Sequence, residues 1–259
     1  MGRDLPALSG VKDTMSTANR KQRELAQRDD MLLDQAQELL EDVGFSNLTL
    51  EKLATRTEFS KGTIYNHFSS KEDLLTALCV RGLQIQLEMY LQVLDFPGHS
   101  REKVIGLHYA YSLYARRHPT LFMCVLSGLA PNVIEKTSPK RMEERRVLEA
   151  RITLVLDKVV KQAFAAGDIG SPLANDEATV SFANWAMSFG SMALLQSARR
   201  ASSIERLNFD TALRCNVDLI LDGLQWRPMS GAWDYEATWQ RLGDFFTEVR
   251  PTLREPALH

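Results

Sequence analysis

The run of residues from 32 to 68 constrains the fold of this chain most, because it predicts three helices in close succession. Apolar residues recur in its first part with the spacing of one face of an α-helix. They are Leu32, Ala36, Leu39, Leu40 and Val43. Gly44 is expected to end this helix, since glycine readily adopts the left-handed conformation that follows a helix C-terminus.

Two shorter helices are predicted directly after it. Thr49 is a good N-cap for a helix over residues 50–56, and Ser60 is one for a helix over residues 61–68. Glu58 and Phe59 are expected to form the turn between them. Three helices with a tight turn between the second and the third are the layout of a helix-turn-helix, in which the third helix reads DNA.

The remainder of the chain is also expected to be helical. Ser70 caps a fourth helix that ends at Pro97. Further helices are predicted over residues 101–118, 121–129, 140–166, 175–199, 213–224 and 233–249. No segment alternates as a strand does, and no internal repeat is visible, so the predicted fold class is all-α.

Composition excludes several classes of protein. Hydrophobic residues make up 44% of the 259 residues and charged residues 25%, as in an ordinary globular protein. No stretch of about 18 apolar residues suggests a membrane span, and the N-terminus does not resemble a secretory signal. Three scattered cysteines argue against a disulfide framework and fit a cytoplasmic location; they are Cys79, Cys124 and Cys215.

Charge is informative only locally, because the net charge is −2. Residues 10–28 hold five basic and two acidic side chains, and residues 49–71 hold four basic and two acidic ones. Two basic segments separated by an acidic run are expected where one face alone meets phosphate. Within the first segment, Arg20, Lys21 and Arg23 are candidates for the DNA minor groove, with a solvated tail as the alternative.

The helix-turn-helix segment resembles the N-terminal domain of TetR-type regulators. The resemblance rests on TLEKLA at residues 49–54 and on SKGTIYNHFSSKEDLL at residues 60–75, and it covers about residues 25–80. Glu58 departs from the family, which usually has glycine or another small residue there. The resemblance implies an all-α homodimer without enzymatic activity, cofactor or metal, which binds a palindromic DNA operator and a small, largely apolar effector.

Composition and periodicity, together with the resemblance, predict the division of the chain. A flexible basic arm is expected at residues 1–24, the DNA-binding domain at 25–80, a regulatory and dimerisation domain at 81–225, and an extension with one extra helix at 226–259. An effector would change the spacing of the two recognition helices. That spacing matters because operator half-sites lie about one DNA turn, roughly 34–36 Å, apart.

Candidate DNA contacts lie on the exposed side of the third helix and on the helix starts that flank it. Base-edge candidates are Lys61, Thr63 and Asn66, since their donors and methyl group suit a major groove. Gly62 lets the backbone approach DNA closely. Phosphate candidates are Thr49, Lys52, Ser60, Tyr65, His67 and Lys71.

The C-terminal part holds weaker candidates, because aromatic and small residues also serve ordinary packing. The effector pocket is predicted from Tyr109, Tyr114, Phe122, Trp185 and Phe189. The dimer interface is predicted from Ala183, Ala186, Gly190, Ala193, Leu194, Val217, Ile220 and Leu221.

Three functional classes compete at this point. A ligand-responsive repressor leads, and an activator or a regulator controlled by a partner protein shares its fold. An enzyme with an incidental helix-turn-helix is the third, but no phosphate loop, nucleophile motif or metal spacing supports it. The sequence does not identify the operator, the effector or the target genes.

Overall fold

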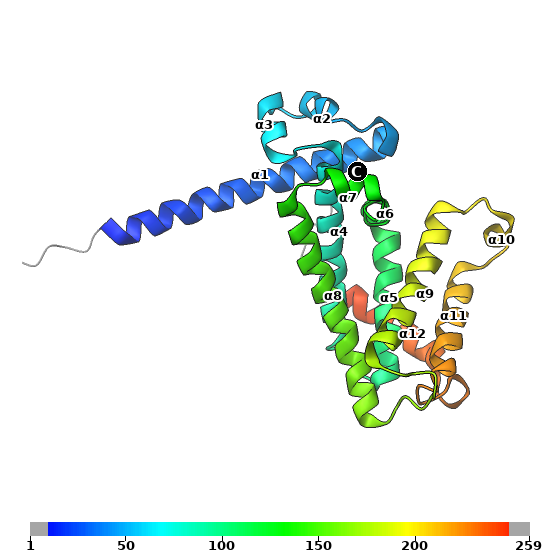
Figure 1. Ribbon diagram of the computed structural model, residues 1–259. Helices are drawn as coiled ribbons and strands as arrows, with labels where there is room; N and C mark the ends of the chain where they lie inside the picture. The colour runs from blue at the N-terminus through cyan, green and yellow to red at the C-terminus, as the bar shows by residue number, and fades with distance from the viewer. Residues whose placement is uncertain (1–9, 249–259) are drawn as a thin grey trace, which may run out of the picture. The chain divides into compact units, whose positions relative to one another are not determined.

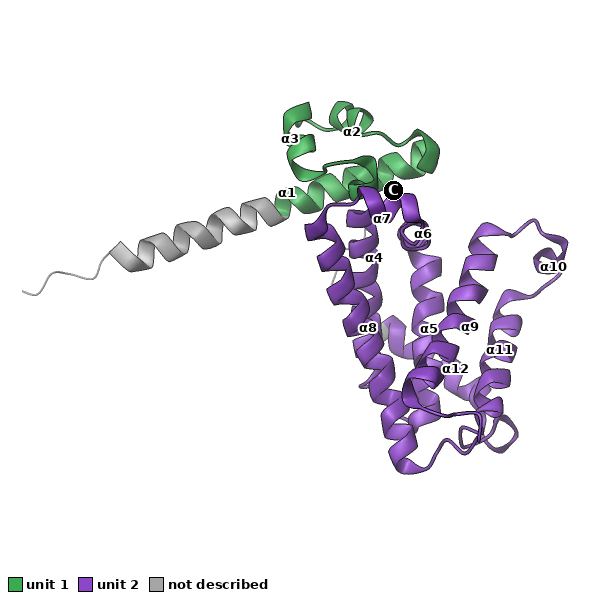
Figure 2. Ribbon diagram, in the orientation of Figure 1, with its two compact units in different colours: residues 1–74 green, residues 75–259 purple. Residues whose placement is uncertain are grey.

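The computed structural model describes the backbone of residues 10–248 and the side chains of residues 27–247. Between Leu74 and Leu75 the chain divides into two compact units, shown in green and purple in Figure 2. The first unit holds α1 (Gly10–Asn47), α2 (Leu50–Arg56) and α3 (Lys61–His67). Gly44 interrupts α1 with φ 74° and ψ 167°, which is where the sequence predicted the helix to end.

The N-terminal arm differs from its prediction. Residues 10–24 were expected to be a flexible arm, but α1 begins at Gly10 and includes them. Good helix formers occupy residues 21–26, and adding a residue to an existing helix is far easier than starting one. The helix anchored at Leu32 therefore extends toward the N-terminus. Residues 1–9, and the side chains of Arg20, Lys21 and Arg23, lie outside what is described.

The second unit is a bundle of helices, visible in Figure 1. Its longer helices are α4 (Lys71–Val93, which starts in the first unit), α5 (Ser100–Arg117), α6 (Pro119–Ser127), α8 (Pro139–Ala166), α9 (Glu177–Ser197), α11 (Phe209–Gly223) and α12 (Tyr235–Glu248). Short turns form α7 (Pro131–Lys136), α10 (Ser202–Glu205) and the 3-10 turn Ser230–Ala232. Residues 10–248 contain no strand, only an isolated bridge between Ile169 and Trp226.

Helix α5 lies at the centre of this bundle and contacts α6, α8, α9, α11 and α12. Most of its side chains are buried, as expected for a helix with neighbours on every side. The imidazole of His108 lies in this core between two side chains of α9. Its Nδ1 is 2.6 Å from Ser188 Oγ, and its Nε2 is 3.0 Å from Asn184 Oδ1.

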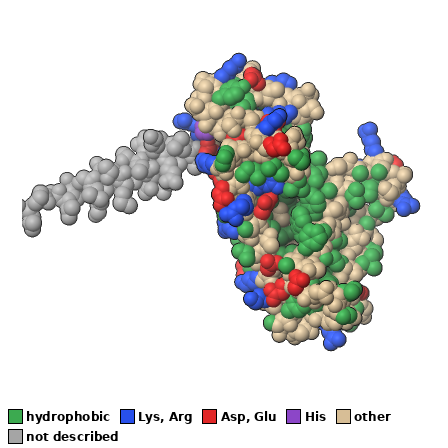
Figure 3. Space-filling model, viewed as in Figure 1, with side chains coloured by type: hydrophobic (Ala, Val, Ile, Leu, Met, Phe, Trp, Pro, Cys, Tyr) green, Lys and Arg blue, Asp and Glu red, His purple; other side chains and the backbone are tan. Residues whose placement is uncertain are grey.

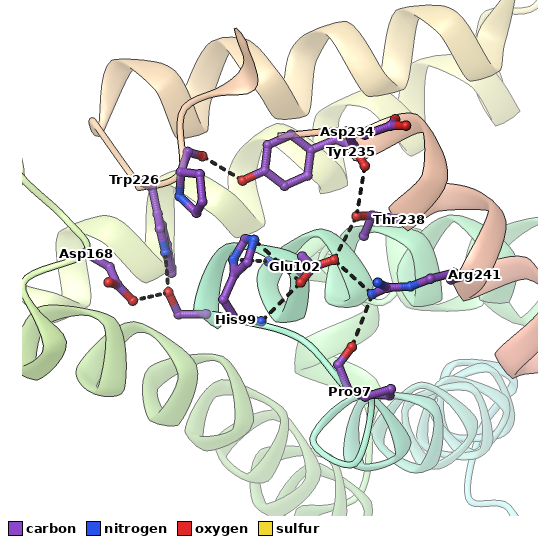
Figure 4. A network of polar contacts seen from close by, with 11 residues as sticks. Pro97, His99, Glu102, Asp168, Trp226, Asp234, Tyr235, Thr238 and Arg241 are labelled. Atoms are coloured by element: carbon purple, nitrogen blue, oxygen red, sulfur yellow. Dashed lines mark hydrogen bonds and ion pairs between the residues drawn. The ribbon is translucent and has the colours of Figure 1, made fainter. Parts of the chain in front are cut away.

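The C-terminal extension packs against the start of α5 through a polar network, drawn in Figure 4. Glu102 is buried, and its carboxylate accepts from Thr238 Oγ1 at 2.9 Å and from Arg241 at 2.8 Å. The indole of Trp226 is fully buried and donates to Ser100 Oγ at 2.9 Å. These contacts hold α12, which lies in the aromatic segment for which the sequence predicted one helix.

The described helices include none that is long and apolar enough to cross a membrane. Over the same residues, His, Cys, Asp and Glu side chains form no group of three that could hold a metal ion.

Candidate DNA-binding surface

The helix-turn-helix is fixed by two hydroxyl caps. Thr49 Oγ1 accepts from the backbone N–H of Lys52 at 3.2 Å, and Ser60 Oγ accepts from that of Thr63 at 3.2 Å. Each hydroxyl satisfies one of the unpaired N–H groups at a helix start, which stabilises helices as short as α2 and α3. Both caps lie where the sequence predicted them.

The inner face of the unit is apolar. Buried side chains of α1, α2 and α3 are Leu32, Ala36, Leu39, Leu40, Leu50, Leu53 and Ile64, with Leu48 and Phe68 just outside these helices. Two further apolar residues of the motif, Ala54 and Phe59, are only half-buried. The ring of Phe59 instead lies 5.9 Å from the guanidinium carbon of Arg28, a cation–π contact with α1.

The outer face of α3 is polar and open. Lys61, Gly62, Tyr65 and Asn66 are exposed, while Thr63 is half-buried. A side chain built on Gly62 would meet only Ser60 Oγ, at 3.8 Å, so the fold itself does not require glycine there. Space beside the backbone is therefore left for something outside the chain.

Two of the phosphate candidates on α3 are engaged by carboxylates. The Tyr65 hydroxyl donates to Glu51 Oε1, and His67 Nδ1 lies 2.8 Å from Asp29 Oδ1. The hydrogen bond from Tyr65 lowers the pKa of the Glu51 carboxyl and raises that of the Tyr65 hydroxyl. Neither carboxylate was predicted, since each lies on a different helix from its partner and local spacing does not reveal such a pair.

The two lysine candidates outside α3 are held by neighbouring backbone carbonyls. Lys52 Nζ donates to Asn47 O at 2.8 Å, and Lys71 Nζ donates to Ser46 O at 3.3 Å. An ammonium has three N–H donors, so each lysine keeps donors for a second acceptor. The end of α1 therefore gathers two cations from α2 and α4 at one turn of the chain.

Glu58 lies in the turn between α2 and α3, at a position where the family usually has glycine or another small residue. Gln225 is the single non-glycine residue with positive φ in the described part of the chain. Glu58 therefore adopts a backbone conformation open to any residue, and its side chain is exposed. The departure from the family's small residue causes no backbone strain.

The five effector-pocket candidates do not line one cavity. Tyr114 and Phe122 are buried together, with ring centroids 6.3 Å apart, while Tyr109 stacks on Phe246 of α12 at 5.7 Å. Trp185 is 42% exposed on α9, with Phe189 beside it at 5.3 Å. A surface pocket of about 470 Å³ lies elsewhere; its lining is Thr211, Arg214, Cys215, Asp218, Leu219, Asp222, Ser230 and Glu236.

The dimer candidates divide between the surface and the core of the second unit. Leu194 is exposed, and Ala183, Ala186, Gly190, Ala193 and Ile220 are half-buried. Val217 and Leu221 are fully buried, so the apolar stripe of α11 faces its own bundle. Sequence periodicity found this inner stripe and missed the exposed side chains of Phe182 and Leu219.

Comparison with known proteins bears on these features. The family model described as "Bacterial regulatory proteins, tetR family" matches residues 32–78. An HTH-type transcriptional regulator of Staphylococcus aureus (strain MRSA252) is 29% identical over 94 residues, which is 36% of this chain and 50% of that protein. The chain thus spans about half the length of the curated relatives it matches.

Solved structures share the fold. PfmR, a TetR family transcriptional regulator from Thermus thermophilus, superposes with a TM-score of 0.57 at 22% identity and covers 74% of this chain and 98% of its own. FadR, a transcriptional regulator from Bacillus subtilis solved in complex with stearoyl-CoA, has a TM-score of 0.55 at 17% identity and covers 74% and 97%. Residues 32–78 therefore match the helix-turn-helix domain of the tetR family of bacterial regulatory proteins, and the fold of the chain is the one that these solved regulators share.

Proposed function

We propose that this protein is a cytoplasmic, homodimeric transcriptional repressor that binds a palindromic DNA operator and releases it on binding a small, largely apolar effector. The proposed function involves no catalytic step, in keeping with relatives that are described as regulators.

The outer face of α3 carries the proposal. Lys61 and Asn66 are exposed there and have no side-chain hydrogen bond to any described residue, so their donors are available to base edges. Gly62 between them leaves the backbone accessible. Lys52 and Lys71 add cations that the end of α1 holds in place, as phosphate contacts require for register on a duplex.

Exposed apolar side chains on α9 and α11 support the proposed dimer. Figure 3 shows hydrophobic side chains on the visible face of the second unit, over α9 and α11. Phe182 and Trp185 of α9 and Leu219 of α11 are among the large apolar side chains that the single chain leaves exposed. Exposed apolar side chains of this size are unfavourable in water, and a second copy would cover them.

Two observations support an apolar effector. Another protein of this fold, FadR from Bacillus subtilis, was solved in complex with stearoyl-CoA. In this chain the Tyr114 ring is buried beside other aromatic rings, and its buried hydroxyl has no hydrogen-bond partner in the described residues. A polar atom of an otherwise apolar effector would satisfy that hydroxyl.

Selection of bound duplexes from a random DNA pool, repeated at several salt concentrations, tests the central claim. The expected result is a palindromic consensus with half-sites about one helical turn, roughly 10 bp, apart. No enrichment even at low salt would refute DNA recognition. A reporter gene placed behind the selected operator then distinguishes repression from activation, and purified protein without added partners tests control by another protein.

A further inference from the structure

Glu51 occupies a central place on the candidate DNA-binding surface, although its charge opposes DNA. It lies in the first turn of α2 and is exposed. Its carboxylate accepts the hydroxyl of Tyr65 from α3. The cation of Lys61 lies near enough to stabilise its negative charge. One carboxylate thus interacts with two of the candidate DNA contacts, Tyr65 and Lys61.

The Tyr65 hydroxyl can donate to Glu51 or to a DNA phosphate, but not to both at once. A tyrosine hydroxyl has a single proton, and a phosphate oxygen of DNA can only accept. While Tyr65 donates to Glu51, it has no proton to donate to a phosphate. The Glu51 carboxylate and a phosphate oxygen therefore compete for the same donor.

We propose that the Glu51 carboxylate occupies the position of a DNA phosphate group in the free protein and must release Tyr65 before Tyr65 binds DNA. The inference rests on the proposed DNA-binding function and adds an autoinhibitory residue to it. Glu51 weakens binding to any duplex by a common factor, because phosphates are the same in every sequence.

Glu58 provides a matched control. It is also an exposed glutamate of the same unit, three residues before Lys61, and it has no hydrogen bond to a described side chain. E51Q and E58Q remove the same charge, but only E51Q weakens an acceptor of the Tyr65 hydroxyl. Their difference isolates the competition from general electrostatic repulsion.

Binding of the full-length chain to a labelled random-sequence duplex is measured by fluorescence anisotropy. The proteins compared are the wild type, E51Q, E58Q, Y65F, and the two double variants that combine Y65F with each glutamate change. We expect E51Q to tighten binding about three- to tenfold, more than E58Q does. In the Y65F background the extra gain of E51Q over E58Q should shrink, because the released hydroxyl is missing.

Two outcomes overturn the inference. E51Q binds more weakly than wild type if Glu51 instead positions Tyr65 for DNA, and it matches E58Q in both backgrounds if the hydrogen bond has no effect. E51A, which removes the acceptor altogether, repeats the comparison, and circular dichroism verifies that each variant is folded. Absence of DNA binding by the wild type at low salt is a different result, since it refutes the proposed function itself.

Discussion

The guanidinium of Arg101 donates to the carboxylate of Asp222 at 2.6 Å, joining the first turn of α5 to the end of α11. Arg101 is 0% exposed and also donates to the Trp226 carbonyl at 2.7 Å, while its guanidinium carbon lies 4.7 Å from the Tyr235 ring centroid. Asp222 in turn accepts from the Ser230 N–H at 3.0 Å. One buried cation therefore links the bundle to its C-terminal extension.

Breaking this pair should strongly destabilise the second unit. Arg101→Ala leaves Asp222 without its cation and removes a buried side chain, so we expect a loss of about 3–5 kcal/mol in the free energy of unfolding. Urea denaturation followed by circular dichroism measures it. Arg116 pairs with Asp210 at 2.9 Å on the surface, and Arg116→Ala should cost at most about 1 kcal/mol. Equal losses in the two variants would contradict this account of Arg101.

His108 makes stability depend on pH. Burial lowers the pKa of its imidazole from 6.5 to about 4 in the folded chain. As the pH falls, the unfolded chain binds this proton first, so stability declines from about pH 6.5 to about pH 4, by up to about 3 kcal/mol. Denaturant melts at a series of pH values measure the slope.

A variant isolates this contribution from other groups. Burial also lowers the pKa of His99 and His118, so the wild-type slope contains their contributions as well. H108Q cannot bind the proton, and its stability should vary less across this pH window than that of the wild type. An unchanged slope would mean that His108 does not titrate as its burial requires.

Local features of the fold were predictable from the sequence, and long-range pairs were not. Thr49, Ser60 and Gly44 act at helix ends through groups within a few residues, so their roles follow from local spacing. Glu51 and Tyr65 are 14 positions apart and Arg101 and Asp222 are 121 apart, which places their contacts beyond any helical period. Only the packing of helices brings such partners together.

The aromatic residues illustrate the same limit. Tyr114 and Trp185 were predicted to share a pocket on grounds of composition, yet one is buried and the other is exposed. Each lies on a helix with many apolar residues, and the packing of the neighbouring helices decides which side of that helix is buried. Periodicity identifies a stripe, as it did for Val217, but it does not state whether the stripe packs within the chain or against a partner.

Gly62 should separate folding from DNA binding. Gly62→Ala adds a methyl group that meets only Ser60 Oγ at 3.8 Å, and alanine favours a helix over glycine by about 1 kcal/mol. We expect unchanged or slightly higher stability, together with DNA binding weakened by about tenfold, or about 1.4 kcal/mol. Thermal unfolding and anisotropy on the selected operator measure the two effects.

Gly243 in α12 is the control for this substitution. A side chain there would meet only Tyr109 Oη, at an ordinary 3.5 Å, so Gly243→Ala should affect neither measurement strongly. If Gly62→Ala binds the operator as tightly as the wild type, the backbone of α3 does not approach DNA closely.

Lys71 should contribute to the salt dependence of binding. Its ammonium is held by the Ser46 carbonyl and is assigned to one phosphate. Lys71→Ala should weaken binding to all sequences and reduce the slope of log affinity against log salt by about 0.9. Lys140→Ala, on α8 of the second unit, is the control and should leave the slope unchanged. A wild-type slope in Lys71→Ala would remove Lys71 from the phosphate contacts.

Leu219 tests the dimer. Its side chain is 67% exposed on α11, and a partner would bury it, so Leu219→Glu places an unpaired charge in the proposed interface. We expect this variant to sediment as a folded monomer, and to bind the palindromic operator more weakly because one subunit contacts only one half-site.

The control for Leu219 is a leucine that is equally exposed but lies on a helix outside the proposed interface. Leu154 of α8 is 65% exposed, so Leu154→Glu introduces the same charge at the same degree of exposure. It should remain a dimer in analytical ultracentrifugation and keep its affinity for the operator. If Leu154→Glu dissociates the protein and Leu219→Glu does not, the two copies associate through α8, and the assignment of the interface to α9 and α11 is wrong.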